Sequence, residues 1–205
     1  KVIKQENWNA VWESDFHPIT IGNKCGVRAD FHKPLNLEYE IIITPKMSFG
    51  TGHHATTYGM MEAMLSLDFQ EKKVLDMGCG TGVLSILAHQ LGSKKVDAVD
   101  IEEWAFNNAI ENISLNGISN IVVYKGGKEK IEGDFDIILA NINRNILIQD
   151  MYSYSSHMLQ NGLILFSGFY EQDLDLISQE AIRQGLKYIS HNSKNNWVTA
   201  KFQKI

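Results

Sequence analysis

A short run rich in glycine joins two apolar segments and carries an acidic residue at its start. The run reads DMGCGTG from Asp76 to Gly82 and lies between the stretches KVLDM and VLSIL. Glycines permit a sharp backbone turn and a close approach to a ligand, and a helix that follows offers free amides and the positive end of its dipole. Gly78 and Gly80 are therefore predicted to contact a cofactor.

Asp100 ends the next apolar run, about twenty residues after the first glycine of the loop. An acidic side chain there can accept hydrogen bonds from both hydroxyls of a ribose, which suits a cofactor that contains adenosine. The dinucleotide fingerprint G-x-G-x-x-G does not fit, because Val83 and Ser85 stand where the third glycine belongs. Asp76 would repel a pyrophosphate but attract an ammonium group, directly or through water. The loop therefore favours S-adenosylmethionine over NAD; the alternative is a glycine turn that only packs tightly.

A second glycine loop, FGTGHHATT, spans residues 49–57 and precedes apolar residues at helical spacing. Such a loop could close over the methionine end of a cofactor and exclude water, so Phe49, Gly50 and Thr51 are predicted cofactor contacts. The alternative is that Thr56 and Thr57 only cap the helix. The two adjacent histidines have no acid or cysteine nearby at metal-ligand spacing, and we expect no metal site.

Asn141 stands where the apolar run DIILA ends. Its amide carbonyl could accept a hydrogen bond from an amine. Methyl transfer from a sulfonium is an in-line displacement that needs the amine lone pair about 3 Å from the methyl carbon, and a lysine must first lose its proton, which desolvation favours. Asn141 is therefore the predicted catalytic residue. The alternative role, which is compatible with the first, is to cap a helix that begins near Asn143.

Strands and helices alternate along most of the chain. Two short runs, FHPITIG and CGVRADF, predict a β-hairpin, and the remaining strands are expected at 38–44, 73–77, 95–99, 120–124, 135–140, 163–166, 186–190 and 197–202, with helices at 54–67, 83–91, 102–116, 143–159 and 173–184. This pattern predicts a Rossmann-like α/β fold with a mostly parallel seven-stranded sheet and an antiparallel terminal hairpin. Ligands lie beyond the carboxyl ends of such strands, where the glycine loop, Asp100, Asn141 and Ser167-Gly168 stand.

The composition is that of a globular domain: 205 residues, 44% hydrophobic and 21% charged, with a net charge of -5. The negative charge disfavours direct binding of nucleic acid. Cys25 and Cys79 show neither metal nor disulfide spacing, which indicates a reducing compartment, and we expect a cytoplasmic monomer. No membrane span or signal peptide is expected, and the lack of an initiating Met suggests that the chain begins inside a longer protein.

Together these motifs resemble the ribosomal protein L-eleven methyltransferase family, the PrmA type. The matching segments follow the family's order over most of the chain: NWNAVW, FHPITIG, MSFGTGHHATT, VLDMGCGTGVLSI, VDAVDIEEWAFNNAIEN, ILANI and LILFSG. The GTGxHxTT element is the most specific, because general methyltransferases lack it. The resemblance implies a class I S-adenosylmethionine-dependent methyltransferase with cofactor contacts at Thr57, Gly78, Asp100 and Asn141.

The resemblance also implies a division of the chain and a substrate. We expect a linker and β-hairpin over residues 1–35 and the catalytic domain over 36–205, with the family's N-terminal recognition domain absent or drastically shortened. The implied reaction methylates, up to trimethylation, lysine and N-terminal amino groups of a large-subunit ribosomal protein. The alternatives are a small-molecule amine methyltransferase and a non-catalytic S-adenosylmethionine-binding module. His53, Ala55 and Ile146 depart from the family pattern, in segments expected to gate the substrate.

Overall fold

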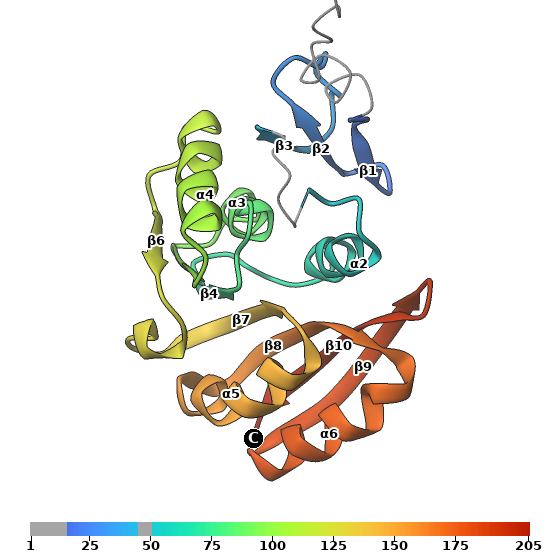
Figure 1. Cartoon of the computed structure of the whole chain (residues 1–205), viewed down its shortest axis with the longest axis vertical. Helices are drawn as coiled ribbons and strands as arrows, with labels where there is room; N and C mark the ends of the chain where they lie inside the picture. The colour runs from blue at the N-terminus through green and yellow to red at the C-terminus, as the bar shows by residue number, and fades with distance from the viewer. Residues whose placement is uncertain (1–15, 45–50) are drawn as a thin grey trace, which may run out of the picture.

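The computed structural model describes residues 16–44 and 51–205, and within these ranges the strands form two sheets (Figure 1). The smaller sheet contains β1 (Ile19–Ile21), β2 (Cys25–Ala29) and β3 (Tyr39–Ile43). β1 and β2 are antiparallel, which confirms the predicted hairpin, and β3 pairs in parallel with β2. β3 thus joins the hairpin across the expected boundary at residue 35, and the division into 1–35 and 36–205 stays a prediction.

The larger sheet has seven strands in the order β6-β5-β4-β7-β8-β10-β9. Their bounds are β4 (Lys73–Met77), β5 (Lys95–Asp100), β6 (Ile121–Lys125), β7 (Phe135–Asn141), β8 (Met158–Tyr170), β9 (Leu186–Lys194) and β10 (Trp197–Lys204). The five neighbouring strands β6, β5, β4, β7 and β8 pair in parallel, and β10 runs antiparallel to both β8 and β9. The predicted Rossmann-like sheet with its terminal hairpin is confirmed.

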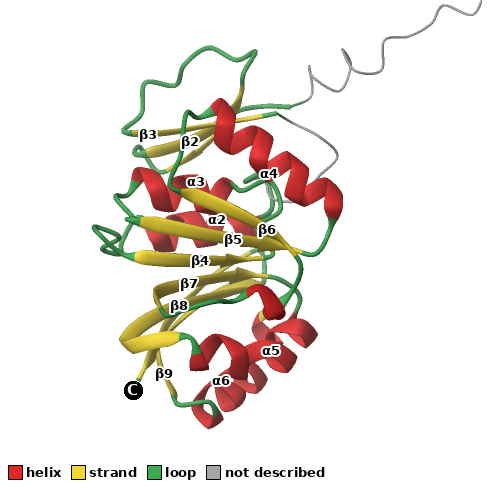
Figure 2. Ribbon diagram, turned by 90° about the vertical axis from the view of Figure 1, so that its left-hand side faces the viewer, coloured by secondary structure: helices red, strands yellow, loops and turns green. Residues whose placement is uncertain are grey.

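Helices cover both faces of this sheet, so the sheet lies between two layers (Figure 2). α2 (Ala55–Met64), α3 (Val83–Gln90) and α4 (Glu103–Leu115) lie on the face toward the smaller sheet, and α5 (Arg144–Ser156) and α6 (Leu174–Arg183) lie on the other. Successive side chains of a strand point to opposite faces, so Val74 packs into one apolar core and Leu75 into the other. The central strands are therefore packed between two apolar cores, which fix the edge of the sheet where their carboxyl ends lie.

The structure corrects the expected boundary between the helix at 143–159 and the strand at 163–166. α5 ends at Ser156, and β8 already begins at Met158, which pairs with Phe135. The ladder is then irregular until Leu163 pairs with Ile137, and Asn161 adopts a φ of 65° within the irregular part. The sequence signal Asn161-Gly162 marks this irregularity inside the strand and not the end of the helix. No helix in the described ranges is long and apolar enough to cross a membrane.

Candidate active site

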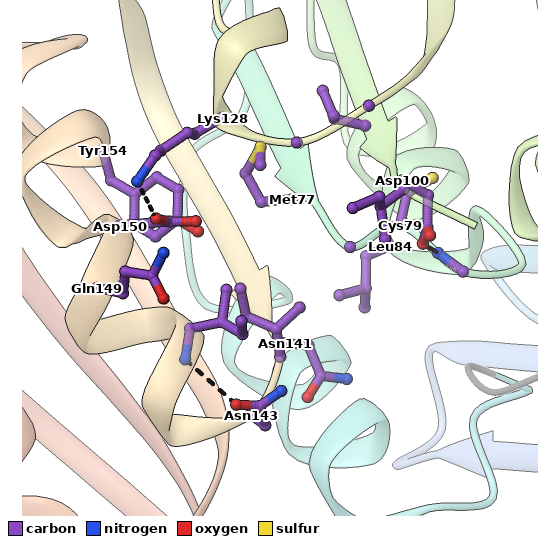
Figure 3. A pocket seen from close by; sticks show the side chains of 18 of the residues that line it. Met77, Cys79, Leu84, Asp100, Lys128, Asn141, Asn143, Gln149, Asp150 and Tyr154 are labelled. Atoms are coloured by element: carbon purple, nitrogen blue, oxygen red, sulfur yellow. Dashed lines mark hydrogen bonds and ion pairs between the residues drawn. The ribbon is translucent and has the colours of Figure 1, made fainter.

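The carboxyl ends of β4, β5 and β7 open onto a cavity of about 560 Å³ (Figure 3). Five of the residues predicted from the sequence line it together: Thr57, Gly78, Gly80, Asp100 and Asn141. They come from a helix start, a loop and two strand ends, which the topology brings to one edge of the sheet. Asp100 and Asn141, which are far apart in sequence, therefore share one cleft.

The glycine loop is anchored on the end of the neighbouring strand. The amides of Gly78 and Cys79 both donate to the carbonyl of Val99, at 2.8 and 3.1 Å. Gly78 has a φ of +70°, and a Cβ atom there would lie 2.3 Å from Cγ2 of Ile142, in the turn after β7. A residue with a side chain would be strained at this position and would displace the side chain of Ile142. Because Gly78 has no side chain, the glycine loop and Ile142 can lie close together at the edge of the cavity.

The carboxylate of Asp100 is held in one orientation by two backbone amides. Oδ2 accepts a hydrogen bond from Gly80 at 2.9 Å, and Oδ1 accepts one from Glu102 at 3.0 Å. The residue is buried, at 9% exposure, yet lines the cavity. A carboxylate has roughly four lone-pair positions, so both oxygens can still accept from a ligand. A fixed pair of acceptors of this kind suits the two hydroxyls of a ribose.

The side chain of Asn141 presents its carbonyl oxygen as an acceptor without a partner. Its Nδ2 donates to Oγ1 of Thr57 at 3.2 Å, whereas its Oδ1 is buried and has no hydrogen-bond partner in the described part of the chain. The cap of α5 is Asn143, whose side chain accepts from the amide of Ile146 at 3.2 Å. The alternative that Asn141 caps this helix is therefore wrong, and its free acceptor is left for a ligand.

The turn that follows Asn141 is confined between two glycines. Gly78 lies against the side chain of Ile142, and a Cβ atom on Gly168 would lie 2.2 Å from the carbonyl oxygen of Ile142. Gly168 has a φ of +93°, and the preceding Ser167 donates to the carbonyl of Val198 at 2.6 Å. Strands β4 and β8 therefore fix the turn of β7 from both sides, and with it the position of the Asn141 amide.

Asp76 lies beneath the glycine loop and does not line the cavity. It is 1% exposed, and its Oδ2 accepts a hydrogen bond from Oγ of Ser85 at 2.5 Å. Burial raises the pKa of Asp76 to about 7, and the nearby charge of Asp100 contributes to this increase. The predicted contact of Asp76 with the cofactor stays a prediction, and from this position it would act electrostatically through the loop.

The second glycine loop is described only in part. Phe49 and Gly50 lie outside the described residues. Thr51 does not line the cavity, and its Oγ1 is 3.1 Å from Nδ1 of His53. His54 caps α2, because its Nδ1 accepts from the amide of Thr56 at 3.3 Å, so Thr57 is free for the contact with Asn141. Within the described ranges, no group of three or more metal-ligating side chains is placed to hold a metal ion.

Sequence reasoning missed the far wall of the cavity, which comes from α5 and from the loop after β6. Lys128 of the 3-10 helix η1 (Lys128–Lys130) pairs with Asp150 of α5, with Nζ 2.5 Å from Oδ1 (Figure 3). Tyr154, one turn further along α5, is fully buried, lines the cavity, and has a hydroxyl with no partner among the described residues. The two glycines before Lys128 could have signalled a ligand loop, whereas nothing in the sequence marks the middle of α5.

The cavity residues fit S-adenosylmethionine. Asp100 offers oriented carboxylate oxygens, Gly78 and Gly80 offer a backbone that a ligand can approach, and Asn141 offers an acceptor without a partner. Apolar side chains supply much of the remaining wall, among them Met77, Leu84, Val99, Ile101 and Trp104. A few oriented polar groups in a mostly apolar cavity are typical of a cofactor site.

The family model of ribosomal protein L11 methyltransferase (PrmA) matches residues 1–205. The chain belongs to this family. The ribosomal protein L11 methyltransferase of Phocaeicola vulgatus is 46% identical, over 98% of this chain and 73% of that protein. The relative from Bacteroides fragilis is 43% identical, over 97% of this chain and 72% of its own length. The crystal structure of the ribosomal protein L11 methylase from Lactobacillus delbrueckii subsp. bulgaricus superposes with a TM-score of 0.84 at 28% identity, covering 93% of this chain and 99% of that one.

Membership in the family identifies the chain as an enzyme that uses S-adenosylmethionine as its methyl donor. The fold class and the cofactor predicted from the sequence are confirmed. The roles of individual residues stay predictions that the geometry supports. Thr57, Gly78, Gly80, Asp100 and Asn141 meet in the cavity, whereas Thr51 and Asp76 lie outside its wall.

Proposed function

We propose that this enzyme transfers methyl groups from S-adenosylmethionine to lysine and N-terminal amino groups of ribosomal protein L11, up to three on each nitrogen. The relatives that match nearly the whole chain are named ribosomal protein L11 methyltransferase, which supports L11 as the substrate. The observation that carries the proposal is the buried Oδ1 of Asn141, which has no partner in the described part of the chain. An amine that receives the methyl group carries N–H groups that can donate hydrogen bonds to such an oxygen.

Asn141 acts by orientation. In this orientation its Nδ2 donates to Oγ1 of Thr57, and Oδ1 keeps its acceptor positions for the ligand. An amine that donates one N–H to Oδ1 has its lone pair directed to one side, and in-line displacement requires such alignment. The cofactor supplies a methyl group bound to a positively charged sulfur. A base held in contact with the nitrogen is unnecessary once the amine is neutral.

The apolar wall of the cavity helps a lysine lose its proton. Met77, Leu84 and Ile146 line the space, and transfer of an ammonium into such surroundings lowers its pKa. The proton leaves to solvent as the ammonium enters the cavity. Each transfer leaves an ammonium, which must lose a proton to solvent before the next transfer, and a neutral dimethylated nitrogen has no N–H left for Asn141. The third transfer therefore depends on the apolar wall, which contacts the methyl groups already added.

The test is mass spectrometry of recombinant ribosomal protein L11 after incubation with the protein and S-adenosylmethionine. We expect up to three methyl additions on individual amines with the wild type. Asn141→Ala should lose most of this activity at saturating cofactor, and this loss of rate should exceed its loss of S-adenosylhomocysteine affinity by calorimetry. Asn145→Ala is the matched control, because Asn145 is an exposed asparagine in the first turn of α5 and lies outside the cavity wall.

Two outcomes would contradict the proposal. Methylation of free amines or amino acids, with none on L11, would indicate a small-molecule methyltransferase. Cofactor binding without transfer to any amine would indicate a binding module. The monomeric state, the cytoplasmic location and the absence of nucleic-acid contacts stay predictions.

A further inference from the structure

Asn112, in the last turn of α4, uses both ends of its side-chain amide to hold two separate backbone segments. Its Oδ1 accepts from the amide of Thr44 at 2.8 Å, and its Nδ2 donates to the carbonyl of Thr81 at 2.8 Å. The residue has 0% exposure. Reversal of the amide would place donor against donor and acceptor against acceptor, so the two bonds fix its orientation.

One of the two segments that Asn112 joins lines the cofactor cavity, and the other is the end of β3. Thr81 belongs to the glycine loop and directly follows Gly80, which lines the cavity. Thr44 directly follows β3. Asn112 does not itself line the cavity. It can therefore affect a ligand only through the position of the loops.

α4 supports the glycine loop over more than this single bond. A Cβ atom added to Gly82 would lie 3.4 Å from the Cβ of Ala109, a distance of ordinary van der Waals contact, so Gly82 lies next to Ala109. Ala109 and Asn112 are three residues apart and so share one face of the helix. The end of the loop thus lies against this face, and the bond to Thr81 adds to the hydrogen bonds that hold Gly78, Cys79 and Gly80 to β5.

Asn116, one turn further along α4, provides a natural comparison. Its amide accepts from the backbone N–H of Ile42 at 3.0 Å and donates to the carbonyl of Ile42 at 2.6 Å. Its other side-chain bond in the described ranges goes to the backbone of Asn112. Asn116 therefore holds the edge of β3 as Asn112 holds Thr44, but its described bonds do not reach the glycine loop.

We propose that Asn112 is a positioning residue that sets cofactor affinity by holding the glycine loop, through Thr81, to Thr44 at the end of β3. The inference concerns the binding of S-adenosylmethionine and not the identity of the methyl acceptor. Its failure would leave the proposed action on L11 untouched, and failure of that action would leave this inference untouched.

The test is calorimetric binding of S-adenosylhomocysteine to the whole chain, compared among the wild type, Asn112→Leu and Asn116→Leu. Asn112→Leu loses one hydrogen bond to Thr44 and one to Thr81, and Asn116→Leu loses two to Ile42, so the melting temperature should fall for both. Asn112→Leu should weaken binding by about tenfold or more, because the carbonyl of Thr81 loses its donor and the loop can shift. Asn116→Leu should change the affinity by less than about threefold.

Two additional measurements decide the question if Asn112→Leu does not fold. Asn112→Ser keeps a polar group but is too short to reach both segments, and it should also bind the ligand less tightly. In the wild type, hydrogen exchange should show that S-adenosylhomocysteine protects the amide of Thr44 more than that of Ile42, since only Thr44 is joined to the glycine loop through Asn112. Equal losses of affinity in the Asn112 and Asn116 variants, unchanged affinity in a folded Asn112 variant, or equal protection of the two amides would overturn the proposal.

Discussion

Replacement of Asp100 by asparagine isolates the contribution of one carboxylate to cofactor binding. The change preserves shape but exchanges an acceptor oxygen for an NH₂ donor. In the wild type the two oxygens accept from the amides of Gly80 and Glu102. After the change, one of these backbone N–H groups faces a donor and loses its partner. On the ligand side, one ribose hydroxyl also loses its acceptor, and the other faces a neutral oxygen in place of a charged one.

The size of the effect follows from these bonds. A hydrogen bond to a charged group contributes about 1.5–3 kcal/mol, and a neutral one about 1 kcal/mol. The loss of one charged bond and the weakening of another therefore lowers the binding free energy by about 3 kcal/mol, which is roughly a hundredfold in the dissociation constant. The backbone amide without a partner lowers the stability of the ligand-free protein by about 1–2 kcal/mol, or about 2–8 °C in Tm.

The assay is titration calorimetry with S-adenosylhomocysteine, together with thermal unfolding with and without the ligand. Asp97→Asn is the control, because Asp97 is another buried acid of β5 and its carboxylate is paired with Lys95, at 2.8 Å, away from the cavity. That variant should lose stability but keep its affinity for the ligand. A folded Asp100→Asn protein whose dissociation constant stays within about threefold of the wild type would refute the assignment of Asp100 to the ribose.

Three further predictions concern groups around the same cavity. The pKa of Asp76 is about 7 in the folded protein and lies near 3.9 in an unfolded chain, so the folded state binds this proton more tightly and its stability falls as the pH rises from about 4 to 7. Asp76→Asn should remove this dependence and stabilise the protein at pH 8 relative to the wild type, on the order of a few kcal/mol, as measured by urea unfolding at pH 5 and pH 8. An unchanged pH profile would show that the carboxyl is already charged throughout. Gly168→Ala should lower both stability and the rate of methyl transfer, since the added Cβ meets the backbone of Ile142, whereas Gly117→Ala, also at positive φ but with nothing within 4 Å, should lower stability by only about 1 kcal/mol and leave the rate unchanged. Equal effects of these two changes would contradict the role given to the Ile142 turn. Tyr154→Phe should stabilise the ligand-free protein by about 1 kcal/mol in thermal unfolding, because it removes a buried hydroxyl that has no partner among the described residues; a loss of stability would reveal a partner for that hydroxyl.

The sequence predicts those features that follow from local pattern and from the direction of the strands. Apolar runs that stop at glycine or at a polar residue mark β4, β5 and β7, and parallel strands bring their carboxyl ends to one edge. Asp100 and Asn141 could therefore be placed in one cleft without knowledge of the tertiary structure. The glycine loop could be assigned to S-adenosylmethionine because its acid and its register disagree with a dinucleotide fingerprint.

Contacts between side chains of helices, strands and loops that are far apart in the sequence could not be predicted in this way. The pairing of Lys128 with Asp150 depends on how α5 docks beside the loop after β6, and no periodicity encodes that distance. The bonds of Asn112 depend on the approach of α4 to β3, which the sequence suggests only as a helix and a strand. The parallel pairing of β3 with β2 was missed for the same reason, since strand propensity does not specify a partner.

The part of the site around Asn141 is held by several elements, and methyl transfer requires a fixed position there. The reaction depends on the alignment of an amine with a carbon–sulfur bond, and a displacement of about 1 Å at the acceptor can reduce the rate on the order of a hundredfold. Asn141 ends a strand whose side chains pack into both cores, and the turn after it lies between Gly78 of one neighbouring strand end and Gly168 of the other. Its amide is bonded to Thr57, which belongs to a fourth element, α2. Four elements thus determine the position of this side chain, as the orienting role proposed for Asn141 requires.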